Sequence, residues 1–330
     1  MNTTVFVVGA IFTALLGTVV GSFLNVCIYR LLRCESLVHP PSHCPNCNHR
    51  LGFLDLFPIF SYLFLGGKCR YCKVKITPRY AIIEAITGIL FLATWWALAL
   101  RFGDDLLFGL GPLILLAGWV FIAAMLVTFQ IDLETTYVIE SVTWVAMGAG
   151  LTAELAEKFL RAEQISFSIA GITIPYLPAA IPGMILGFLV FVLMDLFGRL
   201  VFRKPGMGLG DAYIGAAIGA MLGPWAALLS FGMAIALGAL IGVFLIILGR
   251  LKKTPAPGAV EERAEKNAVK RKKQQPAPES EEEELPEGTY MPFGPFLTAC
   301  AVIIYLAPTW WLEQAGRLMN WWLFENPFMG

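Results

Sequence analysis

The hydrophobic positions of this chain gather in long continuous runs, and the polar positions fall between them. A helix needs about 20 apolar residues to cross the hydrocarbon core of a bilayer. The sequence therefore predicts membrane-spanning helices at residues 5–28, 80–100, 107–129, 138–155, 179–200, 212–222, 226–248 and 292–312. No basic segment precedes the first run, which continues to Tyr29, so we expect a retained span rather than a cleaved signal peptide.

The composition agrees with an all-α polytopic membrane protein of about eight transmembrane helices. Hydrophobic residues make up 57% of the 330 positions and charged residues only 15%, which is less charge than a soluble globular surface needs. The 24 Lys and Arg balance the 24 Asp and Glu. This zero net charge favours no nucleic-acid partner, and the lipid bilayer is the expected environment.

The positions of the basic residues predict the orientation in the membrane. Residues 29–79, 199–204 and 250–273 hold 8, 3 and 9 of them, which is 20 of the 24 Lys and Arg. Cytoplasmic loops carry an excess of Lys and Arg, so these three segments are expected to be cytoplasmic. Eight crossings then leave both termini outside the cytoplasm.

Two polar insertions interrupt the apolar pattern. Residues 254–287 combine four prolines with a basic patch and an acidic block, a composition typical of a disordered cytoplasmic segment. Residues 164–178 partly alternate apolar and polar side chains, which favours a short hairpin or a segment lying in the membrane interface.

The loop at residues 29–79 carries two CxxC pairs separated by 21 residues, a spacing close to that of four-cysteine zinc ribbons. The expected metal ligands are Cys44, Cys47, Cys69 and Cys72. A structural zinc has four protein ligands and no open position, so it would fasten the loop rather than catalyse. The alternative interpretation is a set of free or redox-active thiols.

Among the six aspartates, Asp132 and Asp211 lack a local explanation. Asp132 follows an apolar run, and Asp211 follows the glycine-rich segment 206–210 just before another span. By the topology above, both lie at the cytoplasmic ends of helices. A charge there is costly unless it faces the bundle interior or water.

Two carboxyl groups that converge at one depth do not both ionise easily, so one keeps its proton. Such a pair can act as general base and general acid on one water, which is aspartyl protease chemistry. Gly208 and Gly210 would let the backbone approach the partner carboxylate or an extended peptide. A helix cap or an ion-pair partner is the alternative role for an isolated aspartate at this depth. The chain has no HExxH, GxSxG or Walker motif.

Six motifs in this order resemble those of the type IV prepilin peptidases, which are bifunctional leader peptidases and N-methyltransferases. They are the segment 21–30, the cysteine loop, Arg79-Tyr80 with Glu84, Ile131-Asp132, the Gly-Leu-Gly-Asp segment 208–211 and the Pro-Phe-Gly-Pro-Phe segment 292–296. The resemblance implies an intramembrane aspartyl endopeptidase of the bacterial inner membrane, with Asp132 and Asp211 as its catalytic pair.

The resemblance also implies substrates and a second activity. The substrates would be type IV prepilins or pseudopilins, cleaved after a Gly that ends their short basic leader. The new amino terminus would then be methylated from S-adenosylmethionine. Candidate residues for the methyl-donor site are Gly21, Asn25 and Glu84. The oligomeric state is not determined by the sequence.

The expected organisation has five parts. A first transmembrane helix (1–28) precedes the cytoplasmic zinc-binding loop (29–79) and a transmembrane catalytic bundle (80–253); the disordered insertion (254–287) and the last helix with an outer tail (288–330) follow.

Two other functions remain open from the residues alone. One is a transporter whose membrane carboxylates bind a cation or proton, and the other is a non-catalytic factor for pilus or secretion assembly.

Overall fold

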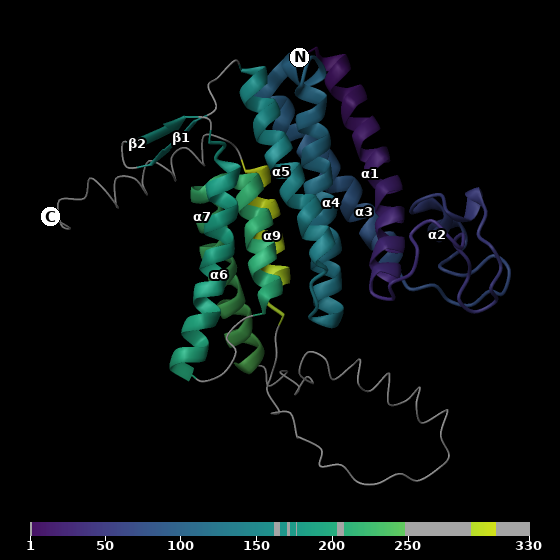
Figure 1. Cartoon of the computed structure of the whole chain (residues 1–330). Coiled ribbons are helices and arrows are strands. Elements are labelled where there is room, and N and C mark those ends of the chain that lie inside the picture. The colour runs from purple at the N-terminus through teal and green to yellow at the C-terminus, as the bar shows by residue number, and fades with distance from the viewer. Residues whose placement is uncertain are drawn as a thin grey trace, which may run out of the picture.

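The structure is a computed structural model of the whole chain, and it describes residues 2–161, 166–169, 172–175, 177–202, 208–247 and 292–307 (Figure 1). The expected disordered insertion at 254–287 and the outer tail after residue 307 lie outside these described residues.

Long helices lying side by side form the body of the protein (Figure 1). They are α1 (Thr3–Leu31), α3 (Arg79–Phe102), α4 (Gly111–Thr135), α5 (Glu140–Leu160), α6 (Ala180–Phe202), α7 (Leu209–Ile247) and α9 (Gly294–Leu306). Short elements connect them: α2 (Phe60–Phe64) and two 3-10 turns, η1 (Phe53–Asp55) and η2 (Gly103–Leu107).

Within the described ranges, five helices are long and apolar enough to cross a membrane: α1, α3, α4, α6 and α7. α5 occupies the expected fourth span but contains four charged residues, and α9 has 13 described residues. The structure therefore supports a helical protein with several membrane spans, while the count of eight stays a prediction.

α7 covers the two expected spans at 212–222 and 226–248, and the chain breaks between them. Gly223 has φ 74° and ψ 173° inside α7, and Pro224 follows it. The ring of Phe191 on α6 lies 5.1 Å from the ring of Phe231. The same ring packs against Gly215, where an added β-carbon would overlap it. A continuous helix would place residues 215 and 231 about 24 Å apart along its axis. The two halves of α7 therefore lie side by side, as two separate spans would.

Small residues allow the helices around α7 to approach closely. A β-carbon on Gly187 would overlap the carbonyl oxygen of Gly215, and one on Gly183 would overlap that of Gly219. Such spacing of small residues is the usual way in which membrane helices bring their backbones together. Glu154 of α5 then caps α6, because its carboxylate accepts hydrogen bonds from the backbone amides of Ala179 (2.6 Å) and Ala180 (2.5 Å).

The expected hairpin in the segment 164–178 is confirmed. β1 (Ser166–Ile169) pairs antiparallel with β2 (Ile172–Pro175), with Ser166 opposite Pro175 and Ile169 opposite Ile172. Apart from this hairpin, the described residues form helices, turns and loops.

Candidate active site and cysteine cluster

Asp132 and Asp211 lie at neighbouring helix ends. Asp132 is in the last turn of α4 and is only 5% exposed. Asp211 is in the first turn of α7, because that helix begins at Leu209, three residues before the expected span. Gly294 of α9 packs against both the carboxyl group of Asp132 and the side chain of Ile214, one turn after Asp211. The structure therefore brings together the two aspartates that the sequence singled out.

The backbone of α9 closes the site from a third side. In the described residues, Oδ2 of Asp132 is buried and has no hydrogen-bond partner. A β-carbon on Gly294 would overlap this oxygen, lie 3.0 Å from Cγ of Asp132 and lie 3.1 Å from Cδ1 of Ile214, one turn after Asp211. Sequence reasoning named the segment 292–296 as a motif but assigned no role to it. A glycine between two Pro-Phe pairs was the available signal.

The two glycines before Asp211 have different surroundings. A β-carbon on Gly210 would lie 2.8 Å from the side chain of Val138, in the connection that follows α4. Gly208 is open, and its carbonyl accepts the backbone N–H of Asp211 at 3.1 Å. Close packing explains Gly210, whereas support of a peptide substrate by Gly208 stays a prediction.

An ion pair holds the end of α4 against α3. Arg79, the first residue of α3, contacts Glu134 at 2.9 Å, and Gln130 also donates a hydrogen bond to this carboxylate. The α4 helix then ends where the N–H of Thr136 donates to the carbonyl of Asp132 at 2.8 Å, with Thr136 at φ 57°. These contacts orient the turn that carries Asp132.

The four cysteines of the two CxxC pairs converge in the loop between α1 and α3. Their sulfur atoms all lie within 4.8 Å of one another, and the Sγ atoms of Cys44 and Cys72 are 3.8 Å apart. Cys44 and Cys69 are buried, Cys72 is partly exposed and Cys47 is exposed. The cysteines are free rather than disulfide-bonded, and this cluster can hold a metal ion.

Each CxxC pair forms the same tight turn. The N–H of Cys44 donates to His49, and the N–H of Cys69 donates to Val74. The N–H groups of Asn48 and Lys73 return to the carbonyls of Cys44 and Cys69, and both residues have positive φ. The repeated geometry aims the two thiols of each pair toward the other pair.

One thiol of the cluster is favoured as a thiolate. The backbone amide of Val74 and the side chain of Asn46 lower the pKa of Cys72 to about 6. The amide of His49 acts in the same direction on Cys47, but desolvation and the sulfur atoms of Cys44 and Cys72 outweigh it and raise its pKa to about 11. A thiolate is the form that binds a metal ion.

Gly21, Asn25 and Glu84 meet where α1 packs on α3. A β-carbon on Gly21 would lie 2.7 Å from the α-carbon of Glu84, so close packing explains this glycine. The side-chain amide of Asn25 donates to the carbonyl of Tyr80 at 3.1 Å, but its buried Oδ1 has no partner among the described residues. Glu84 is buried and accepts the backbone N–H of Ile59 at 2.7 Å.

Two family profiles match the chain. Residues 15–98 match the bacterial peptidase A24 N-terminal domain, which includes the cysteine cluster, and residues 119–243 match the type IV leader peptidase family, which includes Asp132 and Asp211.

Curated relatives match most of the chain. A prepilin leader peptidase/N-methyltransferase of Myxococcus xanthus strain DK1622 is 31% identical over 331 residues, covering 91% of each chain. One from Neisseria gonorrhoeae is 30% identical over 94% of this chain and 93% of its own. A type 4 prepilin-like proteins leader peptide-processing enzyme of Escherichia coli is 30% identical over 63% of this chain and 75% of its own. No solved structure matches significantly.

Proposed function

This chain belongs to the type IV prepilin leader peptidase/N-methyltransferase family, and on that premise we propose that it is an intramembrane aspartyl endopeptidase with Asp132 and Asp211 as catalytic residues. The observation that carries the proposal is that Asp132, in the last turn of α4, and the first turns of α7, which carry Asp211, pack against the same residue, Gly294. Both aspartates lie inside the segment that matches the leader peptidase profile.

Peptide hydrolysis by a pair of carboxyl groups needs one base, which activates the attacking water, and one acid, which protonates the carbonyl oxygen. The ionised carboxylate removes a proton from the water, whose oxygen attacks the carbonyl carbon of the scissile peptide bond. The protonated partner donates its proton toward the carbonyl oxygen, and a proton returned to the amide nitrogen releases the new amino terminus. Asp132 and Asp211 are the two carboxyl groups that would share these roles, with the backbone of Gly294 packed against Oδ2 of Asp132.

The substrates fit the depth of this site. The relatives are named for prepilin or type 4 prepilin-like leader processing, and we extend that substrate class to this chain. A basic leader stays on the cytoplasmic side of the membrane. Its junction with the apolar helix then reaches the helix ends that carry Asp132 and Asp211. This placement uses the orientation expected from the basic residues, in which the loop between α1 and α3 is cytoplasmic.

We assign the cysteine cluster to a structural zinc ion. In a tetrahedral site with Zn–S bonds of about 2.3 Å, sulfur atoms lie about 3.8 Å apart. The Cys44 and Cys72 sulfurs have that separation, and four thiols leave no open coordination position. The ion would hold the two turns of the loop together and take no part in the hydrolysis.

We assign methyl transfer to the contact between α1 and α3. S-adenosylmethionine, when bound, supplies an activated methyl group to the new amino terminus. The buried, partnerless Oδ1 of Asn25 and the carboxylate of Glu84 are acceptors that fit an amino group or hydroxyl groups of such a donor. Gly21 is not needed for this role, because helix packing already explains it.

Mass spectrometry of a model prepilin tests the peptidase. We expect loss of the leader with the unmodified protein and an intact substrate with Asp132→Asn or Asp211→Asn. Asp195→Asn is the matched control, because Asp195 lies near a helix end but pairs with Arg199 at 2.7 Å. Cleavage by either catalytic-pair variant, in protein that accumulates normally, would overturn the assignment.

The same assay with S-adenosylmethionine tests the second activity. Asn25→Ala and Glu84→Gln should preserve leader removal, lose the added methyl mass and weaken binding of the methyl donor measured by calorimetry. Thr87→Ala is the control, since the hydroxyl of Thr87 donates a hydrogen bond to the carbonyl of Ile83 within the same helix. Unchanged donor binding in both variants would place the methyl-donor site elsewhere.

A further inference from the structure

The loop between α1 and α3 exposes a ridge of aromatic side chains. The rings of Phe53, Phe57, Phe60 and Phe64 follow one another with centroid separations of 6.4, 5.6 and 6.4 Å. Phe53 is 80% exposed and Phe64 is 86% exposed. We call these four residues the aromatic ridge. An exposed apolar surface of this kind marks contact with a partner or a membrane.

The ridge is held at the depth of the membrane helices. Ile59, next to Phe60, donates its backbone N–H to Glu84 at 2.7 Å. Glu84 lies five residues after the first residue of α3, which is about 7.5 Å along the helix axis. In Figure 1, α2 lies to the side of the carboxyl-terminal part of α1 rather than beyond its end. The ridge therefore sits beside the bundle, where a bilayer surrounds the helices.

The same loop is positively charged. Residues 32–78 contain six Lys and Arg but only two acidic residues, Glu35 and Asp55. Asp55 is already paired with Arg70 at 2.6 Å. The uncompensated charge suits an anionic surface and opposes a basic peptide.

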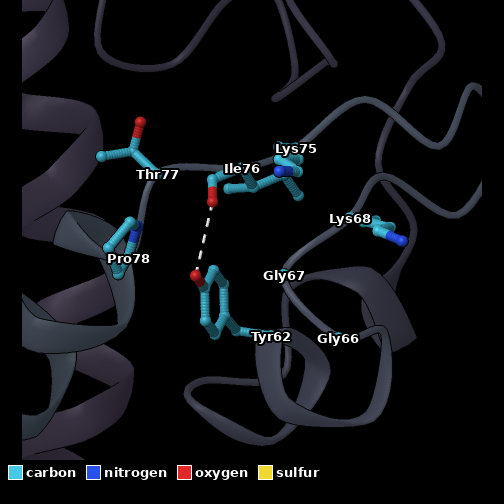
Figure 2. A pocket seen from close by; sticks show the side chains of 8 residues that line it. All are labelled: Tyr62, Gly66, Gly67, Lys68, Lys75, Ile76, Thr77 and Pro78. Carbon is cyan, nitrogen blue, oxygen red and sulfur yellow. Dashed lines mark hydrogen bonds between the residues drawn. The ribbon is translucent and has the colours of Figure 1, made fainter.

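Two of these lysines line a cavity beside the ridge. The backbones of Lys68 and Lys75 pair in an isolated antiparallel bridge, so two positive charges start from neighbouring positions at the rim of the cavity. Neither has an ion pair within the described part of the chain. The cavity has a volume of about 390 Å³, and Figure 2 shows its lining by Tyr62, Gly66, Gly67, Lys68, Lys75 and Ile76. Its far side is the segment that leads into α3.

We propose that the aromatic ridge and the Lys68–Lys75 cavity seat the cysteine loop on anionic phospholipids of the cytoplasmic leaflet. The phenyl rings enter the boundary between headgroups and acyl chains, which lies about 5–10 Å deep for such elements. The lysines hold headgroup phosphates at the water side of the ridge. The proposal rests on membrane insertion of α1 and α3 and does not depend on the peptidase or methyltransferase assignment.

Photocrosslinking of the full-length protein in vesicles identifies what contacts the ridge. Benzoylphenylalanine replaces Phe64 in one variant, Phe53 in a second and Val38 in a third, where Val38 is a control residue of the same loop that is 75% exposed. In vesicles of phosphatidylglycerol and phosphatidylethanolamine with added prepilin, we expect lipid adducts at 64 and 53 at several times the yield at 38. Each variant should bind as much zinc as the unmodified protein, which serves as the control that the loop is folded.

Other results would overturn the proposal. A prepilin adduct at both ridge positions would make the ridge a substrate-docking surface, and an adduct between two copies would make it a dimer interface. Absence of any adduct in both ridge variants would place the ridge in water.

A charge comparison tests the cavity. Lys68→Gln combined with Lys75→Gln should reduce the lipid adduct at 64 several-fold in anionic vesicles and leave it unchanged in purely zwitterionic ones. Lys73→Asn removes a charge of the same loop outside the cavity, and Asn tolerates the positive φ of that residue. Equal effects of the cavity pair and Lys73→Asn would exclude a specific phosphate site.

Discussion

Gly294 lies directly against the carboxyl group of Asp132, although the two residues belong to helices far apart in the sequence. A β-carbon at position 294 would overlap Oδ2 of Asp132. Gly294 also lies beyond residue 243, where the match to the leader peptidase profile ends. The backbone of α9 is thus a third wall of the candidate active site, beside the end of α4 and the start of α7.

Gly294→Ala should impair cleavage by displacing the Asp132 carboxyl group or α9. We expect a loss of at least about tenfold in kcat/KM for a model prepilin, equivalent to about 1.4 kcal/mol of transition-state stabilisation. Gly232→Ala in α7 is the control, because nothing lies within 4 Å of its β-carbon position. Full activity of Gly294→Ala would mean that α9 is remote from the reacting atoms.

Removal of two cysteines on opposite turns should release the metal. Cys44→Ser combined with Cys72→Ser should lower bound zinc from about one ion per chain toward zero, measured by elemental mass spectrometry, and should make the loop sensitive to proteases. Cys34→Ser is the control, since Cys34 is exposed and outside the cluster. An unchanged zinc content in the double variant would contradict a four-cysteine site.

Breaking the ion pair between Arg79 and Glu134 should weaken catalysis without abolishing it. Both side chains are about one-third exposed, so the pair contributes little stability, but it orients the turn that carries Asp132. We expect Arg79→Gln and Glu134→Gln each to lower kcat several-fold with little change in KM. The double variant should be no worse than either single one, and additive losses would refute a shared role.

Acid should weaken the cysteine loop through Asp55. Burial alone raises the pKa of Asp55, but hydrogen bonds from Arg70, the Gly52 amide and Tyr71 outweigh it and leave the pKa below its ordinary value. A carboxyl group with a lowered folded-state pKa stabilises the fold above its unfolded pKa of about 3.9, and this contribution is lost as the pH falls through the folded-state value.

Asp55→Asn removes this contribution. By hydrogen exchange, we expect the variant loop to be less protected than the unmodified one by a constant factor between about pH 5 and 8. Below about pH 4 the difference should shrink as Asp55 takes up its proton. A difference that persists in acid would mean that the charge of Asp55 is not what stabilises the loop.

The sequence was sufficient for features that depend on local pattern and composition. Long apolar runs predicted most of the helices, alternation predicted the hairpin of β1 and β2, and the spacing of the two CxxC pairs predicted the cysteine cluster. Rarity also helped: with only six aspartates, the unexplained pair Asp132 and Asp211 stood out.

Only the tertiary structure decided which surfaces meet. Gly294 reaches Asp132 because α9 returns to the end of α4, and Ile59 reaches Glu84 because the cysteine loop folds back beside α3. Neither contact leaves a periodic signal, since one backbone atom against one side chain imposes no pattern on its neighbours. The sequence by itself therefore determined the elements and the reactive residues, while long-range packing decided the third wall of the site and the position of the aromatic ridge.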